Sequence, residues 1–210
     1  MTRLSLATEN ESAGLRQYLE RLVALDNRAV VRVQAGGAAM GVWSGPPFEV
    51  VALKPVGLNG IGEVDATVPA QRLLERVTTG FEFDLPDTVP GPSWVGLLPP
   101  REGWEIRGKS DVANVRAAVD SAKQFFRQRA EGVTDQRLLQ DIANDVWERT
   151  CLAEVPVRSA HAAESLGLLG PGDGEVVAYA TDAWTRLAAP GGSVATRRGL
   201  MPSIPFFALN

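Results

Sequence analysis

Residues 103–110 match the spelling of a phosphate-binding loop, G-x-x-x-x-G-K-[ST], through Gly103, Gly108, Lys109 and Ser110. In such a loop the backbone N–H groups wrap the phosphates, the lysine reaches them, and the hydroxyl binds magnesium. The motif works only where it follows directly from a buried strand and begins a helix. The neighbouring sequence therefore decides whether this stretch binds a nucleotide.

That neighbouring sequence argues against a nucleotide site. Pro99 and Pro100 stand where a buried strand should end, and Trp104 and Glu105 put bulk and negative charge inside the loop. The residues that follow predict helices and then antiparallel strands, whereas a nucleotide-binding fold of this kind needs parallel strands. We interpret the match as fortuitous and expect no cofactor.

A simpler local structure accounts for the same stretch. Trp104 and Ile106 are expected to face the core from a short strand. Gly108 then turns the chain, and Ser110 caps a helix that begins at Asp111.

The chain has one cysteine, Cys151, and one histidine, His161. One cysteine excludes an internal disulfide, and so small a set of soft ligands gives no zinc site. The two could serve as nucleophile and base only if the fold brings them together, and no orienting group is signalled. We therefore expect no catalytic residues and favour a protein that is not an enzyme. An enzyme whose pocket no motif signals is the second alternative.

DNA binding is the first alternative, and it follows from the order of the predicted elements. Helices over about 111–131 and 135–150, a third helix after Pro156, and a hairpin over about 183–198 resemble a winged-helix arrangement. In that arrangement the residues that contact DNA would be Arg158, Ser159, His161, Arg197 and Arg198.

Charge weighs against this alternative, because phosphate contacts dominate affinity for DNA. The net charge is −4. Residues 106–132 carry six basic and three acidic side chains, but a local explanation is available. If the first two of these helices form an antiparallel hairpin about Gly132, Lys123 lies near Asp141 and Arg116 near Glu148.

Hydrophobic periodicity predicts an α+β protein. A helix over about 11–25 follows the capping box Thr8–Glu11, and short strands are expected at 29–33, 38–43, 48–53 and 62–68, with Gly36-Gly37 as the first turn. A helix then begins at Pro69. We expect an α+β subdomain with a mainly antiparallel sheet over 1–105. Residues 106–210 would form a helical subdomain with a small β-hairpin, the boundary lying in proline-rich residues 84–103.

Composition is ordinary for a globular chain, with 45% apolar and 22% charged residues among 210. No stretch has the length of apolar residues that a membrane helix needs, and the first ten residues lack the apolar core of a signal peptide. We expect a cytoplasmic protein.

The last residues form an apolar tail that either packs on its own domain or docks on a partner or a second copy. Its large apolar side chains are Met201, Ile204, Phe206, Phe207 and Leu209. Together with the absence of a motif for metal, nucleotide or covalent chemistry, this tail favours a regulatory or protein-interaction protein that binds a protein partner or self-associates.

Deleting residues 202–210 tests the tail. Burial of even half of its apolar surface, at about 25 cal/mol per Å², is worth several kcal/mol. We expect truncation either to lower the melting temperature at unchanged mass or to lower the mass at unchanged stability, measured by thermal melts and sedimentation. If neither quantity changes, the burial argument fails.

Overall fold

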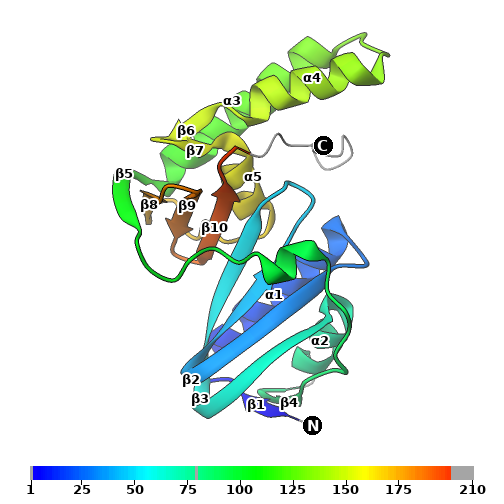
Figure 1. Cartoon of the computed structure of the whole chain (residues 1–210), viewed down its shortest axis with the longest axis vertical. Coiled ribbons are helices and arrows are strands. Elements are labelled where there is room, and N and C mark those ends of the chain that lie inside the picture. Colours follow the sequence, from blue (N-terminus) through cyan, green and yellow to red (C-terminus); the bar gives the residue numbers. More distant parts are fainter. Residues whose placement is uncertain (1, 79, 200–210) are drawn as a thin grey trace. The chain divides into compact units, whose positions relative to one another are not determined.

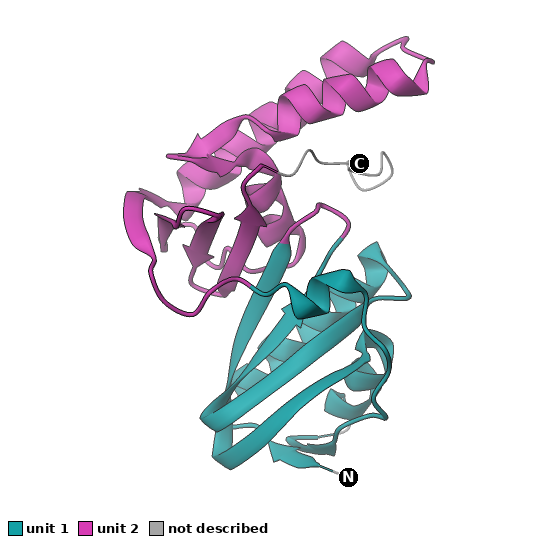
Figure 2. Cartoon of the chain, viewed as in Figure 1, with its two compact units in different colours: residues 1–46, 51–98 teal, residues 47–50, 99–210 magenta. Residues whose placement is uncertain are grey.

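The computed structural model describes residues 2–78 and 80–199, and these fold into two compact units. Unit 1 comprises residues 1–46 and 51–98, and unit 2 comprises residues 47–50 and 99–210 (Figure 2). Helices and mainly antiparallel strands occur in both units (Figure 1). The predicted α+β class is confirmed. Within the described residues, no helix is both long and apolar enough to span a membrane.

Unit 1 contains two helices, a long antiparallel strand pair and a small two-stranded sheet. Its elements are β1 (Arg3–Ser5), α1 (Glu9–Leu25), β2 (Val30–Ser44), β3 (Val51–Pro69), α2 (Ala70–Val77), β4 (Glu82–Asp84) and the 3-10 helix η1 (Ser93–Gly96). The predicted cap of α1 is confirmed, since the Thr8 side chain accepts a hydrogen bond from the Glu11 N–H. Leu15, Tyr18 and Leu19 are buried at helical spacing, as the periodicity indicates.

Strand β2 is one long strand, so the predicted turn at Gly36-Gly37 is wrong. Gly36 and Gly37 pair with Glu63 and Gly62 of β3, and the register shifts only after Gly37. Gly37 has φ +81°, a value that glycine adopts at no steric cost. The two glycines therefore accommodate a bulge within a continuing ladder, where the sequence predicts separate short strands.

Unit 2 contains four antiparallel sheet strands in the order β10-β9-β8-β5, with helices packed on one face, and the short strand pair β6-β7. Its elements are β5 (Glu105–Asp111), α3 (Val112–Ala130), α4 (Gln136–Trp147), β6 (Thr150–Leu152), β7 (Val155–Pro156), α5 (Val157–Ser165), β8 (Glu175–Ala180), β9 (Trp184–Ala189) and β10 (Gly192–Arg197). Helices α3 and α5 contact the sheet, and the side chains of Val176, Leu187 and Val194 are buried at 0% exposure.

Helices α3 and α4 form the predicted hairpin, but with a different register. Arg129 pairs with Asp145, and Arg149 lies over the Phe125 ring at 4.1 Å. Lys123 instead binds Glu164 of α5 at 2.6 Å, and Arg116 donates to the Gly170 carbonyl. The predicted pairs Lys123–Asp141 and Arg116–Glu148 are wrong, because the contacts of Asp145 with Arg129 and of Arg149 with Phe125 set α4 in a different register along α3.

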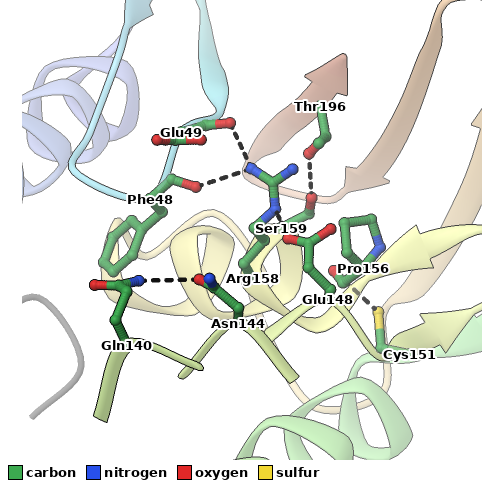
Figure 3. A network of polar contacts seen from close by, with 10 residues as sticks. All are labelled: Phe48, Glu49, Gln140, Asn144, Glu148, Cys151, Pro156, Arg158, Ser159 and Thr196. Atoms are coloured by element: carbon green, nitrogen blue, oxygen red, sulfur yellow. Dashed lines mark hydrogen bonds and ion pairs between the residues drawn. The ribbon is translucent and has the colours of Figure 1, made fainter. Parts of the chain in front are cut away.

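A buried guanidinium holds unit 2 together around α5 (Figure 3). The Arg158 side chain is 3% exposed; it donates to the carbonyls of Phe48 and Glu49 at 3.1 and 2.7 Å, and its Nε lies 2.5 Å from Glu148 Oε1. Burial raises the pKa of Glu148, and the charge of Arg158 partly opposes that rise. One cation thus joins α5, the end of α4 and residues 47–50.

Replacing Arg158 by Met should lower the free energy of unfolding by about 3–5 kcal/mol, because Glu148 and two carbonyls lose their partner in a buried place. Chemical denaturation followed by circular dichroism measures the change. Arg197→Met is the matched control: Arg197 is exposed, so a change within about 0.5 kcal/mol is expected. Equal effects of the two substitutions would contradict the role of Arg158.

Candidate functional site

The face of the unit 2 sheet opposite α3 and α5 carries an unusual set of side chains. Because neighbouring residues of a strand point to opposite faces, the burial of Ala178, Leu187 and Val194 places Tyr179, Arg186 and their neighbours on the other face. We call the set on that face the outer-face cluster. It consists of Trp104, Ile106, Tyr179, Trp184, Arg186 and Arg197.

Strand register brings the members together. Tyr179 of β8 is paired with Arg186 of β9 on one side and with Ile106 of β5 on the other. Arg197 of β10 is paired with Trp184 of β9. Residues that are diagonal across two strands lie about 7–8 Å apart, so Arg186 and Arg197 are neighbours on this face.

Arg186 is the centre of the cluster. Its guanidinium carbon lies 4.3 Å from the centre of the Trp104 ring and 4.6 Å from that of Tyr179, both within cation–π range. The Trp104 ring is itself fixed, because its Nε1–H donates to the Pro100 carbonyl at 2.8 Å. Burial lowers the pKa of Arg186, and the Tyr179 side chain partly opposes that shift. Two rings therefore hold a partly desolvated cation.

The charge of Arg186 is not neutralised within the described part of the chain. Its Nε is buried and has no hydrogen-bond partner there. Other basic side chains of this sheet do have acidic partners: Lys109 pairs with Glu175 at 3.1 Å, and Arg107 with Glu105 at 2.9 Å. The site thus presents a cation together with aromatic rings, and it can bind an anionic or hydrogen-bond-accepting group.

The phosphate-loop spelling falls on a strand. Gly108, Lys109 and Ser110 pair with residues 176–178 of β8, so the chain there is extended and does not wrap around a ligand. Only Gly103 precedes the strand, with φ +79°. The Lys109 Nζ lies 3.1 Å from both carboxylate oxygens of Glu175.

Three details of the predicted local structure are wrong. Gly108 does not turn the chain, because it lies within β5 and pairs with Ala178. Ile106 is 59% exposed and belongs with Trp104 to the outer face, because its cross-strand partner Tyr179 points away from the helices. The helix cap is Asp111, whose side chain accepts from the Asn114 N–H at 2.7 Å, and not Ser110. The strand continues up to Asp111, and Ser110 is part of its ladder.

The recognition helix proposed for DNA binding is wrong, since its residues are buried. Arg158, Ser159 and His161 are 2%, 1% and 5% exposed. Ser159 shares a hydrogen bond of 2.5 Å with Thr196, and the His161 ring stacks on Trp147 at 4.7 Å. The polar side chains that suggest a DNA-binding helix in the sequence make contacts inside unit 2 instead.

The remaining predicted residues have separate positions. Arg197 and Arg198 are exposed at the end of β10, and Arg198 pairs with Glu154. The tail residues Met201, Ile204, Phe206, Phe207 and Leu209 lie outside the described residues.

Cys151 and His161 have different partners. The thiol of Cys151 lies 3.8 Å from the Pro156 carbonyl, whereas His161 contacts the rings of Trp147 and Phe48. Among the described residues there is no group of three or more His, Cys, Asp or Glu that could hold a metal. Burial raises the pKa of the Cys151 thiol to about 11.

Alkylation of Cys151 should consequently be slow. With a pKa of about 11, the thiolate fraction at pH 8 is on the order of 0.1%, so iodoacetamide should react roughly 100-fold more slowly than with a free cysteine. Mass spectrometry over time measures the rate, and the chain unfolded in guanidinium chloride serves as the fast control. A native rate equal to the unfolded rate would show a reactive thiol.

Sequence reasoning missed the outer-face cluster. The signal available was the alternation of small or branched residues with Tyr179, Trp184 and Arg186 along residues 175–189. That alternation gives the face of each residue but not the strand order, and the strand order is what brings Trp104 to Arg186.

Two family models match this chain, and both are described as domains of unknown function. Residues 1–96 match the family model described as Domain of unknown function (DUF8010), and residues 99–201 match that of Domain of unknown function (DUF8185). A comparison with curated proteins gives no match.

Comparison with solved structures shows the fold. The chain is similar to the DNA polymerase sliding clamp from Pseudomonas aeruginosa with ligand, at TM-score 0.55 and 13% identity, over 97% of this chain and 66% of that one. The sliding clamp from Caulobacter crescentus gives TM-score 0.56 and 12% identity, over 97% and 67%. DNA polymerase III subunit beta from Borrelia burgdorferi, in complex with a natural product, gives 0.55 and 11%, over 97% and 66%.

The chain thus spans about two thirds of the length of these clamps. At such identities the similarity concerns the fold alone, and it is that of the α+β sliding clamps. The comparisons give no support to a winged helix.

Proposed function

We propose that this chain is a non-catalytic protein-interaction module whose contact surface includes the outer-face cluster. The observation that carries the proposal is the composition of that cluster. Tryptophan, tyrosine and arginine are the residues most enriched among those that dominate binding energy at protein interfaces. Here three aromatic side chains, two arginines and an exposed isoleucine share one sheet face.

The fold similarity supports the same proposal. The similar structures are those of a DNA polymerase sliding clamp and of a polymerase subunit, so this fold is used by proteins that work in an assembly. A sheet face held rigid by strand pairing is also a good interaction surface, because little conformational entropy is lost on binding. We also propose that the chain is cytoplasmic, because a single unpaired cysteine is ordinary in cytoplasmic proteins.

The partner is proposed to be a protein or a second copy of this chain, and not a nucleic acid. The net charge of −4 disfavours a polyanion. The helices of unit 1, α1 and α2, carry four basic and four acidic side chains, so they form no basic surface. The apolar tail beyond residue 200 remains a proposed second contact.

Two exposed isoleucines provide a matched test. Ile106 in the cluster is 59% exposed and Ile61 in unit 1 is 89% exposed, so Glu at either position should fold normally. We expect Ile106→Glu to remove proteins captured by the tagged full chain, because a buried charge opposes docking, while Ile61→Glu retains them. Quantitative mass spectrometry of the captured proteins, with sedimentation for self-association, measures both.

Loss with both variants, or with neither, would contradict the proposal. Melting temperatures within a few degrees of the unchanged chain are required of both variants, so that loss of folding is not mistaken for loss of binding.

A further inference from the structure

We propose that the outer-face cluster binds an acidic, extended segment of a protein partner, with carboxylates of that segment placed on Arg186 and Arg197. This inference rests on the proposed function and names the chemistry of the partner. Three features of the cluster carry it: the contacts of Arg186, the pairing of the other basic residues nearby, and the apolar residues beside the two arginines.

Arg186 retains donors that its contacts do not satisfy. Trp104 and Tyr179 interact with its guanidinium through their ring faces, and a ring face is a poor substitute for a hydrogen-bond acceptor. Within the described residues, Nε is buried without an acceptor and no carboxylate lies within ion-pair distance. The guanidinium is planar and matches a carboxylate in two parallel hydrogen bonds.

Arg197 is the second unneutralised cation of this face. It is exposed, and among residues 2–78 and 80–199 it has no acidic partner. By contrast, Lys109, Arg107 and Arg198 are all paired with glutamates. The positive charge that remains is therefore concentrated at two adjacent side chains, a spacing suited to neighbouring carboxylates on an extended chain.

The residues beside the two arginines favour a peptide over a nucleic acid as the bound partner. Ile106 and Trp184 supply apolar surface next to the charges, which suits an apolar side chain of the bound segment. Glu105, Glu154 and Glu175 lie around the paired basic residues and would repel a continuous row of phosphates. A short segment with one or two carboxylates meets the arginines without approaching these glutamates.

Selection from a random dodecapeptide phage library on the immobilised full chain tests the proposal. We expect the enriched peptides to contain Asp or Glu beside an apolar residue. Synthetic copies should bind at least about tenfold more weakly to Arg186→Gln and to Arg197→Gln, because each loses a charge-assisted hydrogen bond. Arg107→Gln, which removes an already paired arginine, should bind as the unchanged chain does.

Each alternative result has a distinct meaning. Exchange of the peptide carboxylates for amides should remove binding, and retention would overturn the proposal. If the enriched peptides lack carboxylates and no longer bind the Ile106→Glu variant, the partner is not acidic, but the cluster is still a protein-binding surface as proposed. If no enriched peptide binds more weakly to the cluster variants, the proposal of an acidic partner is overturned. The capture experiment with Ile106→Glu and Ile61→Glu then tests the proposed function separately. Arginine-dependent binding of a twenty-nucleotide DNA would identify a nucleic acid instead. Arg197 is exposed, so its variant remains informative if the Arg186 variant unfolds.

Discussion

The two faces of the unit 2 sheet have different surroundings, and this asymmetry governs what each residue of the unit can do. Helices α3 and α5 cover one face, so the alternate positions on that face, such as Ala178 and Leu187, are buried. The intervening positions lie on the opposite face, where polar and aromatic side chains are tolerated. Arg186 lies on this face, and its partly buried cation needs neighbouring side chains that compensate for the loss of water. Trp104 and Tyr179 are those neighbours.

Two arginines of unit 2 illustrate opposite solutions to burial. Arg158 is almost fully buried, and two carbonyls and Glu148 compensate its charge. Such a group stabilises one arrangement of α5, α4 and residues 47–50, and at 2% exposure it is not accessible to a ligand. Arg186 is only partly buried and is contacted by rings, which leave its hydrogen-bonding capacity unused. The first arginine is structural, whereas the second is suited to recognition.

Much of the helical part could be predicted from the sequence, because α1 and α3 bury apolar residues at regular helical spacing and begin at capping residues. The long strand β2 was not predictable, since Gly36-Gly37 is equally suited to a turn and a bulge. The outer-face cluster depends on strand order, which brings residue 104 next to residue 186. Because these residues are far apart in the sequence, no local sequence pattern indicates their contact. Arg158 resembles a surface residue in the sequence because only the fold reveals its carbonyl partners.

The recognition proposed for this face depends on the contact of Arg186 with Trp104, which can be measured by nuclear magnetic resonance of the Arg186 side chain. A guanidinium held at 4.3 Å from an indole ring experiences a strong ring current. We expect the Arg186 side-chain protons to resonate upfield of their positions in the unfolded chain and to move downfield in Trp104→Ala, with the Tyr179 ring retaining part of the shift. Ordinary chemical shifts in the unchanged chain, unaffected by Trp104→Ala, would contradict it.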